Sequence, residues 1–315
     1  MTERVSVRKA YGQALAKYGA INTDVVVIVA DVSSSVMTNY FAEKFPQRFF
    51  NVGIQEAGMV DTAVGFALAG MVPFVNTFAG LFLRAVEQIR TCVAYARTNV
   101  KLVGSYAGLS DFKDGPTHHS IIDLAIMRSM PDMAVIVPAD ATEVEKMVPA
   151  VAEYDGPVYL RISRTDMPVV FDEKHEVEIG KGVVVRDGSD VTLISSGIMV
   201  SRCVEAAELL GDERMDAGVV NMHTLKPLDV SMVKEAAETG AIVTAEEHSI
   251  IGGLGSAVAE VVAAQCPVPL ERVGIADTFT ETALDPESLL DYYGMAVKDI
   301  VKAARRATKR KGKNI

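Results

Sequence analysis

Glu56 is the first residue whose type and setting point to chemistry. It lies near the head of the stretch FNVGIQEAGMVDTAVGFALAG, residues 50–70, which consists mainly of small and apolar residues. Burying an ionised carboxylate without a partner costs several kcal/mol, so Glu56 must face solvent, be paired, or contact a ligand. A carboxylate is also favoured in the first turn of a helix, and GIQE is expected to begin one. The local pattern therefore leaves both a helix-start role and a ligand-binding role open.

A Gly-Pro turn in KDGPTHHSIIDLAIM, residues 113–127, forms a second candidate site. It presents Asp114, His118 and His119 just before a predicted apolar helix, and a turn followed by a helix start is a natural ligand contact. Adjacent histidines point in different directions on regular elements, and no acid or cysteine stands at ligand spacing, so a metal pair is disfavoured. We expect His118 to act as an acid, a base or a hydrogen-bond donor. Asp114 and Thr117 could equally be turn and capping groups.

Charged groups at predicted strand ends form a third candidate site. Asp31 follows one predicted strand and Arg164 follows another. Ligands of parallel sheets bind at the carboxyl ends of the strands. Arg8, on the first predicted helix, would form a phosphate clamp with Ser35 and Arg164 if the fold gathers the three.

A glycine-rich turn follows a strand end in EEHSIIGGLGSAVAEVVA, residues 246–263. Its spacing matches neither a dinucleotide fingerprint nor a nucleoside-triphosphate loop, so a tight turn with close helix packing is favoured. We expect His223 and His248 to line an interface or cap strands rather than to catalyse.

The elements that must position these groups alternate between short β-branched runs and longer segments of helical period. This pattern is typical of an α/β fold with parallel strands joined by crossover helices. A chain of 315 residues is long enough for two such domains. In the first half the strands are expected at residues 25–30, 100–105, 133–139 and 157–163.

The segment 165–190 is charged, contains Pro and Gly, and lacks a helical stripe, so it predicts a linker with one hairpin. The predicted domains are residues 1–168 and 190–315, joined by a linker at 169–189. A second, smaller parallel sheet is expected from strands at 191–197, 217–222 and 241–247, with helices over 200–210 and after Asp229.

Composition and charge exclude several classes of protein. Hydrophobic residues make up 49% of the chain, aromatic residues 6% and charged residues 23%, as in a compact α/β protein. The net charge of -10 disfavours nucleic-acid or membrane-surface binding. The basic run at the C-terminus is interpreted as a frayed, solvated helix end. The N-terminus lacks the apolar core of a signal peptide, and no run is long enough to span a membrane.

The cysteines Cys92, Cys203 and Cys266 lie far apart with no ligand spacing. They favour a reducing compartment and argue against a disulfide framework or a zinc ribbon. We expect them to be buried small hydrophobes and the protein to be cytoplasmic.

Taken in order, six stretches of the first half resemble the pyrimidine-binding domain of transketolase. They are VADVSSS, NVGIQEAGMVDTAVGFALAG, VPFVNTFAGLFLRAVEQIR, DGPTHHSIID, VIVPADATE and YLRISR. The remainder resembles the transketolase C-terminal domain, with VVNMHTLKPLD and AEEHSIIGGLGSAVAE as its characteristic turns. The resemblance covers essentially the whole chain, and the ordered set of motifs is far more specific than any single one.

The resemblance implies a cofactor, thiamine diphosphate, which serves as the electron sink for carbon-carbon cleavage. At the position of Glu56 the family has a glutamate that hydrogen-bonds the ring nitrogen of the thiamine aminopyrimidine in an apolar neighbourhood. Phe78 is then expected against the aminopyrimidine ring, in a pocket shared with Leu81 and Arg84.

The same resemblance implies a substrate site on this chain. Glu56 and His118 fall on catalytic positions, and His118 also falls on a contact to the sugar hydroxyls. The remaining positions that match substrate contacts in the family are Arg8, Asp31, Ser35, Tyr106, Asp114 and Arg164.

The sequence departs from the family in two places. Leu81 and Arg84 stand where transketolases often have aromatic residues, so the pyrimidine pocket looks less aromatic than usual. Tyr106 stands where many have a substrate-contacting histidine, and His119 replaces a common glutamine. Both substitutions bear on substrate preference.

The resemblance also implies a partner subunit. The family holds the cofactor diphosphate through magnesium (Mg2+) or another divalent cation on a Gly-Asp-Gly motif in an N-terminal domain, and no such motif occurs here. We therefore expect no metal ligands on this chain and a separate N-terminal-half subunit that carries them. The chain would form the two-fold core of a heterotetramer that acts on sugar phosphates, as one half of a split transketolase.

Three alternatives remain open at this point. A carboligase resembling 1-deoxyxylulose-5-phosphate synthase and the beta subunit of a 2-oxo-acid decarboxylase share the domain pattern. A non-catalytic scaffold subunit would keep the fold without the chemistry, although the joint presence of Glu56, His118 and Arg164 argues against it.

Overall fold

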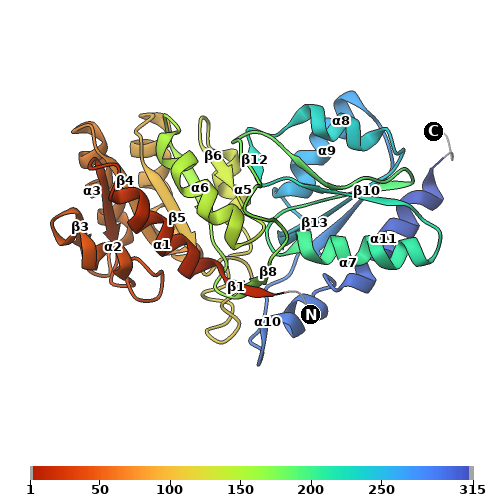
Figure 1. The fold of residues 1–315 in the computed structure, drawn as a ribbon, viewed down its shortest axis with the longest axis horizontal. Coiled ribbons are helices and arrows are strands. Elements are labelled where there is room, and N and C mark those ends of the chain that lie inside the picture. Colours follow the sequence, from red (N-terminus) through yellow and green to blue (C-terminus); the bar gives the residue numbers. More distant parts are fainter. Residues whose placement is uncertain (1–2, 312–315) are drawn as a thin grey trace.

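The computed structural model describes residues 3–311. Figure 1 shows two α/β units along the long axis of the molecule, one from the N-terminal half of the chain and one from the C-terminal half. Each unit has a central sheet with helices against its faces, as predicted from the alternating pattern. The fold class is confirmed.

The larger sheet, within the described residues, has seven strands in the order β12-β6-β7-β5-β4-β2-β3. Its members are β2 (Val25–Val29), β3 (Phe49–Asn51), β4 (Val72–Phe78), β5 (Lys101–Ser105), β6 (Ala134–Ile136), β7 (Val158–Arg161) and β12 (Thr224–Lys226). Every neighbouring pair is parallel except β12 with β6. The predicted strands correspond to β2, β5, β6 and β7, whose β-branched residues are buried as in a sheet covered on both faces.

Helices of α, 3-10 and π type cover this sheet. They are α1 (Val7–Gly19), α2 (Asn39–Lys44), η1 (Pro46–Arg48), α3 (Glu56–Leu68), η2 (Ala79–Ala85), α4 (Val86–Gln88), η3 (Ile89–Tyr95), α5 (Asp123–Ser129) and α6 (Ala141–Glu153). Side-chain caps set two of the starts, because Ser6 accepts a hydrogen bond from the amide of Lys9 and Asp140 accepts one from the amide of Glu143.

The smaller sheet has the order β14-β13-β10-β11-β9. Its elements are β9 (Val183–Arg186), β10 (Val191–Ser195), β11 (Ala217–Asn221), β13 (Ile242–Ser249) and β14 (Leu270–Ile275), with α7 (Met199–Asp212), α8 (Val230–Ala237), α9 (Leu254–Gln265), α10 (Pro286–Tyr292) and α11 (Val297–Arg310). The strands are parallel except β9, which runs antiparallel to β11 at the edge.

The hairpin predicted in the linker is wrong. β8 (Asp166–Pro168) pairs instead with β1 (Arg4–Ser6), and β9 pairs with β11. Both linker strands therefore find partners far away in sequence, which local turn residues cannot reveal. The C-terminal half also lends β12 to the larger sheet, so the two units share backbone hydrogen bonds as well as side-chain contacts.

Two smaller expectations also need correction. Only Cys203 is buried, whereas Cys92 and Cys266 are partly exposed. The basic segment before residue 312 is a packed helix rather than a frayed end, because α11 buries Ile300, Ala303 and Ala307 against the second unit. The rest of the basic run, residues 312–315, lies outside the described residues.

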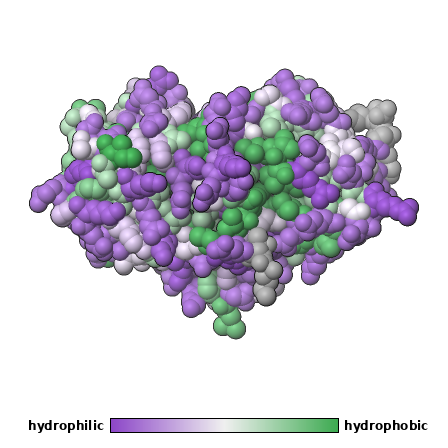
Figure 2. Space-filling model, in the orientation of Figure 1, coloured by the Kyte–Doolittle hydropathy of each residue, from purple (hydrophilic) through white to green (hydrophobic). Residues whose placement is uncertain are grey.

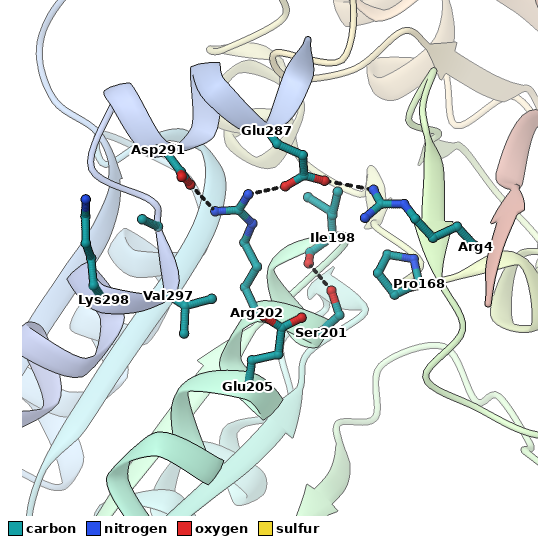
Figure 3. A pocket seen from close by; sticks show the side chains of 11 residues that line it. Arg4, Pro168, Ile198, Ser201, Arg202, Glu205, Glu287, Asp291, Val297 and Lys298 are labelled. Atoms are coloured by element: carbon teal, nitrogen blue, oxygen red, sulfur yellow. Dashed lines mark hydrogen bonds and ion pairs between the residues drawn. The ribbon is translucent and has the colours of Figure 1, made fainter. Parts of the chain in front are cut away.

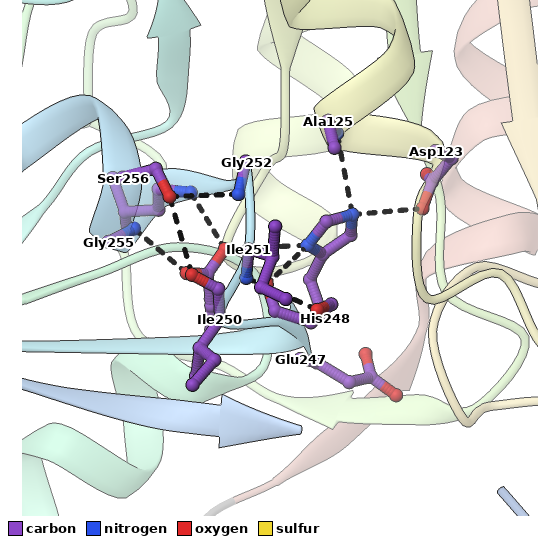
Figure 4. Close-up of polar contacts among 12 residues, drawn as sticks. Asp123, Ala125, Glu247, His248, Ile250, Ile251, Gly252, Gly255 and Ser256 are labelled. Carbon is purple, nitrogen blue, oxygen red and sulfur yellow. Dashed lines mark hydrogen bonds and ion pairs between the residues drawn. The ribbon is translucent and has the colours of Figure 1, made fainter. Parts of the chain in front are cut away.

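The junction between the two units is polar and buried. Arg161, at the end of β7, donates from Nε to Asp123 Oδ2 at 2.8 Å, and its Nη2 donates to the backbone carbonyls of Ser120 and Glu247 at 3.0 Å each. His248 Nε2 lies 4.0 Å from Asp123 Oδ1. Figure 4 shows the imidazole facing this carboxylate. The expectation that His248 lines an interface is confirmed.

Burial governs the ionisation of this cluster. Burial raises the pKa of Glu246 and that of Glu247 to about 7, and it lowers the pKa of His248 to about 4. Burial is the largest single influence and acts to raise the pKa of Asp123, but the Arg161 charge and the other polar partners of the carboxylate together outweigh it, so the pKa is lowered. At neutral pH the junction therefore holds an Arg161–Asp123 ion pair beside a neutral His248.

The glycine-rich turn supports the same junction. Glu246 Oε2 accepts a hydrogen bond from the amide of Leu254 and Oε1 accepts one from the amide of Gly255, at the start of α9. A Cβ on Gly253 would lie 2.0 Å from Glu246 Oε2, so only glycine fits there. The turn serves helix packing, as predicted from its spacing.

A second polar link lies in a pocket at the edge of the junction. Figure 3 shows Glu287 of α10 between two arginines. Its carboxylate accepts a hydrogen bond from Arg4 of β1 at 2.8 Å and another from Arg202 of α7.

The surface of the molecule is mixed in character. Figure 2 shows apolar residues gathered between the two units on the face drawn, with mostly hydrophilic flanks. None of the helices in residues 3–311 has the length and apolar character needed to cross a membrane.

The buried ion pair yields a stability prediction. Asp123→Asn leaves the Arg161 guanidinium buried without its counter-charge, which should lower the free energy of unfolding by about 3–5 kcal/mol. Urea unfolding followed by circular dichroism measures this. Asp132→Asn is the matched control, since its bidentate pair with Arg97 is exposed, and it should change stability far less. Equal losses in the two variants would contradict the proposed importance of the junction.

The raised pKa of Glu247 yields a pH prediction. Between pH 4.5 and about 7 the unfolded chain has released this proton while the folded chain still holds it, so rising pH costs stability. The cost is on the order of 2–3 kcal/mol and levels off above the folded pKa. Glu247→Gln does not ionise, so its stability relative to the native chain should rise from pH 5 to pH 8 in paired urea titrations. A difference that stays constant with pH would contradict this.

Candidate functional site

The carboxyl edge of the larger sheet gathers most of the residues that the sequence singled out. β4 ends at Phe78 and β5 ends at Ser105, and the loop after β5 runs from Tyr106 to the start of α5. The sequence did not predict β4, because Pro73 and Asn76 interrupt its apolar run.

Glu56 is the first residue of α3 and is only 4% exposed. The predicted helix start is confirmed. Its carboxylate is paired, with Arg84 Nη1 at 3.3 Å from Oε1 and 3.4 Å from Oε2. Arg84 itself is 59% exposed, on η2 next to the half-buried Leu81. The neighbourhood expected to be apolar thus contains one long, exposed cation that the sequence did not pair with Glu56.

Tyr106 forms a platform at the edge of the sheet. Its ring stacks on Phe78 with the centroids 4.0 Å apart at 18°. The guanidinium carbons of Arg8 and Arg164 lie 4.9 and 5.0 Å from its centroid. Tyr106 has φ +58°, a strained conformation that persists only where the surroundings impose it. One face of Phe78 is therefore covered by protein.

The predicted clamp of Arg8, Ser35 and Arg164 does come together. Arg8 donates from Nε to the Arg164 carbonyl at 2.9 Å and from Nη1 to the Ser35 carbonyl at 2.7 Å and the Tyr106 hydroxyl at 2.9 Å. The Ser35 contact runs through its backbone. Residues from α1, from the loop after β2 and from the segment between β7 and β8 thus meet at one point.

Asp111 is the site residue that the sequence reasoning missed. It is fully buried and forms an ion pair with Arg164. Burial raises the pKa of Asp111, nearby Asp114 raises it further, and Arg164 opposes both. The only feature of the sequence that pointed to Asp111 is its place as an acidic residue three positions before Asp114 in the same loop.

The two histidines of the loop play different parts. His118 is partly exposed, lies 6.2 Å from the Phe78 ring and contacts the Thr117 hydroxyl at 3.0 Å. His119 is buried, and its Nε2 donates to the Asp111 carbonyl at 3.1 Å. Because burial lowers the pKa of His119, its Nδ1 accepts from the Thr280 hydroxyl at 2.7 Å. His119 therefore ties the loop to the C-terminal unit.

Asp31 lies apart from the arginines. It has φ +60°, its amide donates to Asn51 Oδ1 at 3.0 Å, and its Oδ1 accepts from Asn51 Nδ2 at 3.1 Å. These bonds fix the end of β2 against the turn that leads to Glu56. Asp114 is exposed on the loop and retains access to a ligand.

A cavity of about 460 Å³ opens beside the clamp. Its lining includes Arg4, Arg8, Phe112 and Arg164, together with Glu287 from the second unit. The concentration of guanidinium groups suits an anionic substrate group.

The residues present fit the pyrimidine end of thiamine diphosphate. Apart from Arg84, no partner within the described residues occupies the Glu56 carboxylate, so its oxygens can accept a hydrogen bond from a ligand nitrogen. The remaining edge of Phe78 provides an aromatic contact. Among residues 3–311 no group of three or more His, Cys, Asp or Glu side chains is placed to hold a metal ion.

Fold and site together define an α/β protein of two units, with a buried carboxylate and a cluster of arginines at the carboxyl edge of its larger sheet. Comparison with known families gives the particular family. A model described as the transketolase pyrimidine-binding domain matches residues 3–169, and one described as the transketolase C-terminal domain matches residues 180–300. The chain belongs to the transketolase family.

Similar proteins span the same portion of the enzyme. The 6-deoxy-6-sulfo-D-fructose transketolase subunit of Clostridium sp. strain MSTE9 is 40% identical over 97% of this chain and 95% of that protein. One of the subunits of the apulose-4-phosphate transketolase of Phocaeicola vulgatus is 34% identical over 97% of this chain and 98% of its own length. A solved split-gene transketolase, described as an inactive beta4 tetramer, has 44% identity and a TM-score of 0.91, covering 98% of this chain and 99% of that one.

These findings confirm the resemblance drawn from the sequence. The chain is a transketolase subunit of a two-subunit enzyme, and the family depends on thiamine diphosphate. The comparisons therefore favour a transketolase subunit over the two alternatives, a decarboxylase beta subunit and a separate carboligase.

The Tyr106 platform yields a kinetic prediction. Tyr106→Phe removes the hydroxyl that orients Arg8 and keeps the ring stack, so the KM for a ketose-phosphate donor should rise about 5- to 20-fold with little change in kcat. Steady-state assays of the assembled enzyme measure this. A fall in kcat with an unchanged KM would show instead that the hydroxyl acts in the chemical step.

Proposed function

We propose that this chain binds both the cofactor and the sugar substrate of a split transketolase at the carboxyl edge of its larger sheet. Glu56 binds the aminopyrimidine of thiamine diphosphate held by the partner subunit, and the arginine clamp binds the charged tail of the sugar. The observation that carries the proposal is the buried carboxylate of Glu56 at the start of α3, within the same sheet edge as Arg8, Tyr106 and Arg164.

Glu56 orients the cofactor through a hydrogen bond in a site from which most water is excluded, where such a bond is strong. Its exposed partner Arg84 can withdraw into solvent when the ligand nitrogen takes its place. Bound thiamine diphosphate supplies the electron sink for cleaving and forming the carbon-carbon bond. Phe78 offers an aromatic edge to the pyrimidine, and Leu81 fills the adjacent surface.

The substrate is oriented by groups on the loop and the clamp. His118 and Asp114, both reachable from solvent, hydrogen-bond the sugar hydroxyls, and His118 is positioned to exchange a proton with one of them. Arg8 and Arg164 receive the anionic tail, with Ser35 holding Arg8 in place. Asp31 contributes from the end of β2. This arrangement favours a sugar with a charged tail over a short 2-oxo acid.

The partner subunit is proposed to carry the diphosphate-binding domain with Mg2+ or another divalent cation. Two copies of this chain would form the two-fold core of a heterotetramer. Relatives named for a sulfo-sugar and for apulose 4-phosphate indicate that donors differ among split enzymes, so the pentose phosphate route is one candidate pathway. We propose domains at 1–168 and 190–315 and a cytoplasmic location, which the free cysteines favour.

The first experiment measures ketol transfer from xylulose 5-phosphate to ribose 5-phosphate. This chain is assayed alone and with the N-terminal-half subunit, with thiamine diphosphate and magnesium supplied. Activity is expected only in the mixture.

Glu56→Gln tests the assigned role directly. With the carboxylate gone, turnover of the assembled enzyme should fall at least about 100-fold, while assembly by size-exclusion chromatography stays intact. Glu43→Gln, on the outer surface of α2, is the matched control and should leave turnover unchanged. Unchanged turnover in Glu56→Gln would exclude the proposed cofactor contact.

A further inference from the structure

The arginines of the cavity beside the clamp differ in how their charge is balanced. Arg4 pairs with Glu287 at 2.8 Å, and Arg164 pairs with buried Asp111. Within the described residues Arg8 has no carboxylate at ion-pair distance, and its donors go to two carbonyls and a hydroxyl. Among residues 3–311, only one of the three guanidinium charges that line the cavity is thus left without an anion.

Asp111 is the buried member of the two balancing carboxylates, whereas Glu287 is 42% exposed. Asp111 is fully buried, so water does not screen it, whereas the Arg164 side chain is 26% exposed toward the cavity. Its second oxygen, Oδ2, has no hydrogen-bond partner among residues 3–311. Arg164 is therefore the group that stabilises the Asp111 carboxylate. If Arg164 left Asp111 in order to pair with a ligand, the buried charge of Asp111 would be unpaired.

The surroundings of Arg164, within the described part of the chain, hold about as many acids as cations. The cations are Arg8, which binds the Arg164 carbonyl, Arg4, which pairs with Glu287, and the exposed Lys113, which shares the Phe112 ring with Arg164. The acids are Asp111, Asp114, Asp166 and Glu287. His119 bonds the Asp111 carbonyl and is neutral. A phosphate monoester carries close to two negative charges at pH 7.5, because its second pKa is about 6. A sulfonate carries one.

We propose that Asp111 sets the charge accepted by this cavity, so that the site binds a sugar tail with one negative charge in preference to a doubly charged phosphate. Asp111 is a specificity-determining residue in this role and does not touch the reacting atoms. The proposal rests on the assignment of the clamp to the sugar tail and narrows it to a class of substrate.

The test compares two ligands that differ only in the tail, fructose 6-phosphate and 6-deoxy-6-sulfofructose. Each is titrated calorimetrically at pH 7.5 into the complex of this chain with its partner subunit. The native complex should bind the sulfonate at least about fivefold more tightly. Asp111→Asn should tighten phosphate binding about tenfold and sulfonate binding much less, which brings the ratio to one or reverses it.

Asp166→Asn is the matched control. Asp166 is exposed and lines the same cavity, but its side chain does not pair with Arg164, so the ratio should stay within about twofold of native. An unchanged ratio in Asp111→Asn, or an equal change in Asp166→Asn, would overturn the proposal.

A second measurement uses only the native complex, so it does not depend on the folding of a variant. In the native complex the affinity for the phosphate relative to the sulfonate should rise as the pH falls from 8 to 5.5, because the phosphate becomes singly charged. A flat ratio would also overturn the proposal. Ketol transfer from erythrulose, which has no charged tail, checks the proposed function separately: if it is absent, that function fails, while the binding ratios still report on Asp111.

Discussion

The buried ion pair between Arg161 and Asp123 is the interaction on which the site depends. Arg161 ends β7 and Asp123 begins α5, so the pair closes the loop of residues 106–122 at its far end. The same guanidinium binds the Glu247 carbonyl of the second unit. Because a buried charge is costly unless fully paired, an arrangement of the two units that broke these contacts would strand Arg161. The observed arrangement places the loop with Tyr106 and Asp111 over the sheet edge.

Backbone strain appears where this arrangement meets the site. Tyr106 and Asp31 both take positive φ, at the ends of β5 and β2. For a bulky residue such as Tyr106 this conformation costs about 1–3 kcal/mol and persists only when neighbours hold it, whereas an aspartate adopts it more readily. Stacking with Phe78 and hydrogen bonding with Arg8 hold Tyr106, and Asn51 holds Asp31. The tertiary contacts of these residues thus maintain backbone conformations, and hence side-chain directions, that the local sequence alone would not favour.

Much of this could be predicted from the sequence, and the failures have physical causes. Buried strands such as β2 and β5 are short apolar runs bounded by turn residues, and the helix start at Glu56 follows from its position after a turn. The meeting of Arg8, Ser35 and Arg164 required the resemblance, because no local pattern links positions so far apart. β12 was missed because a strand of three residues has no periodicity, and its partner β6 belongs to the other unit. The pairings of Arg84 with Glu56 and of Asp111 with Arg164 depend on tertiary contacts alone.

Those two ion pairs differ in a way that matches the cofactor side and the substrate side proposed for them. At the cofactor side the carboxylate is buried and the guanidinium is 59% exposed, so Arg84 loses little when a ligand nitrogen replaces it. At the substrate side the guanidinium is 26% exposed and its carboxylate is wholly buried, so the pair cannot separate without stranding Asp111. Under the proposed function the first pair would be exchanged for a ligand contact, while the second would stay in place. Such a chain would give up a counter-ion to bind its cofactor and keep one while it selects its substrate.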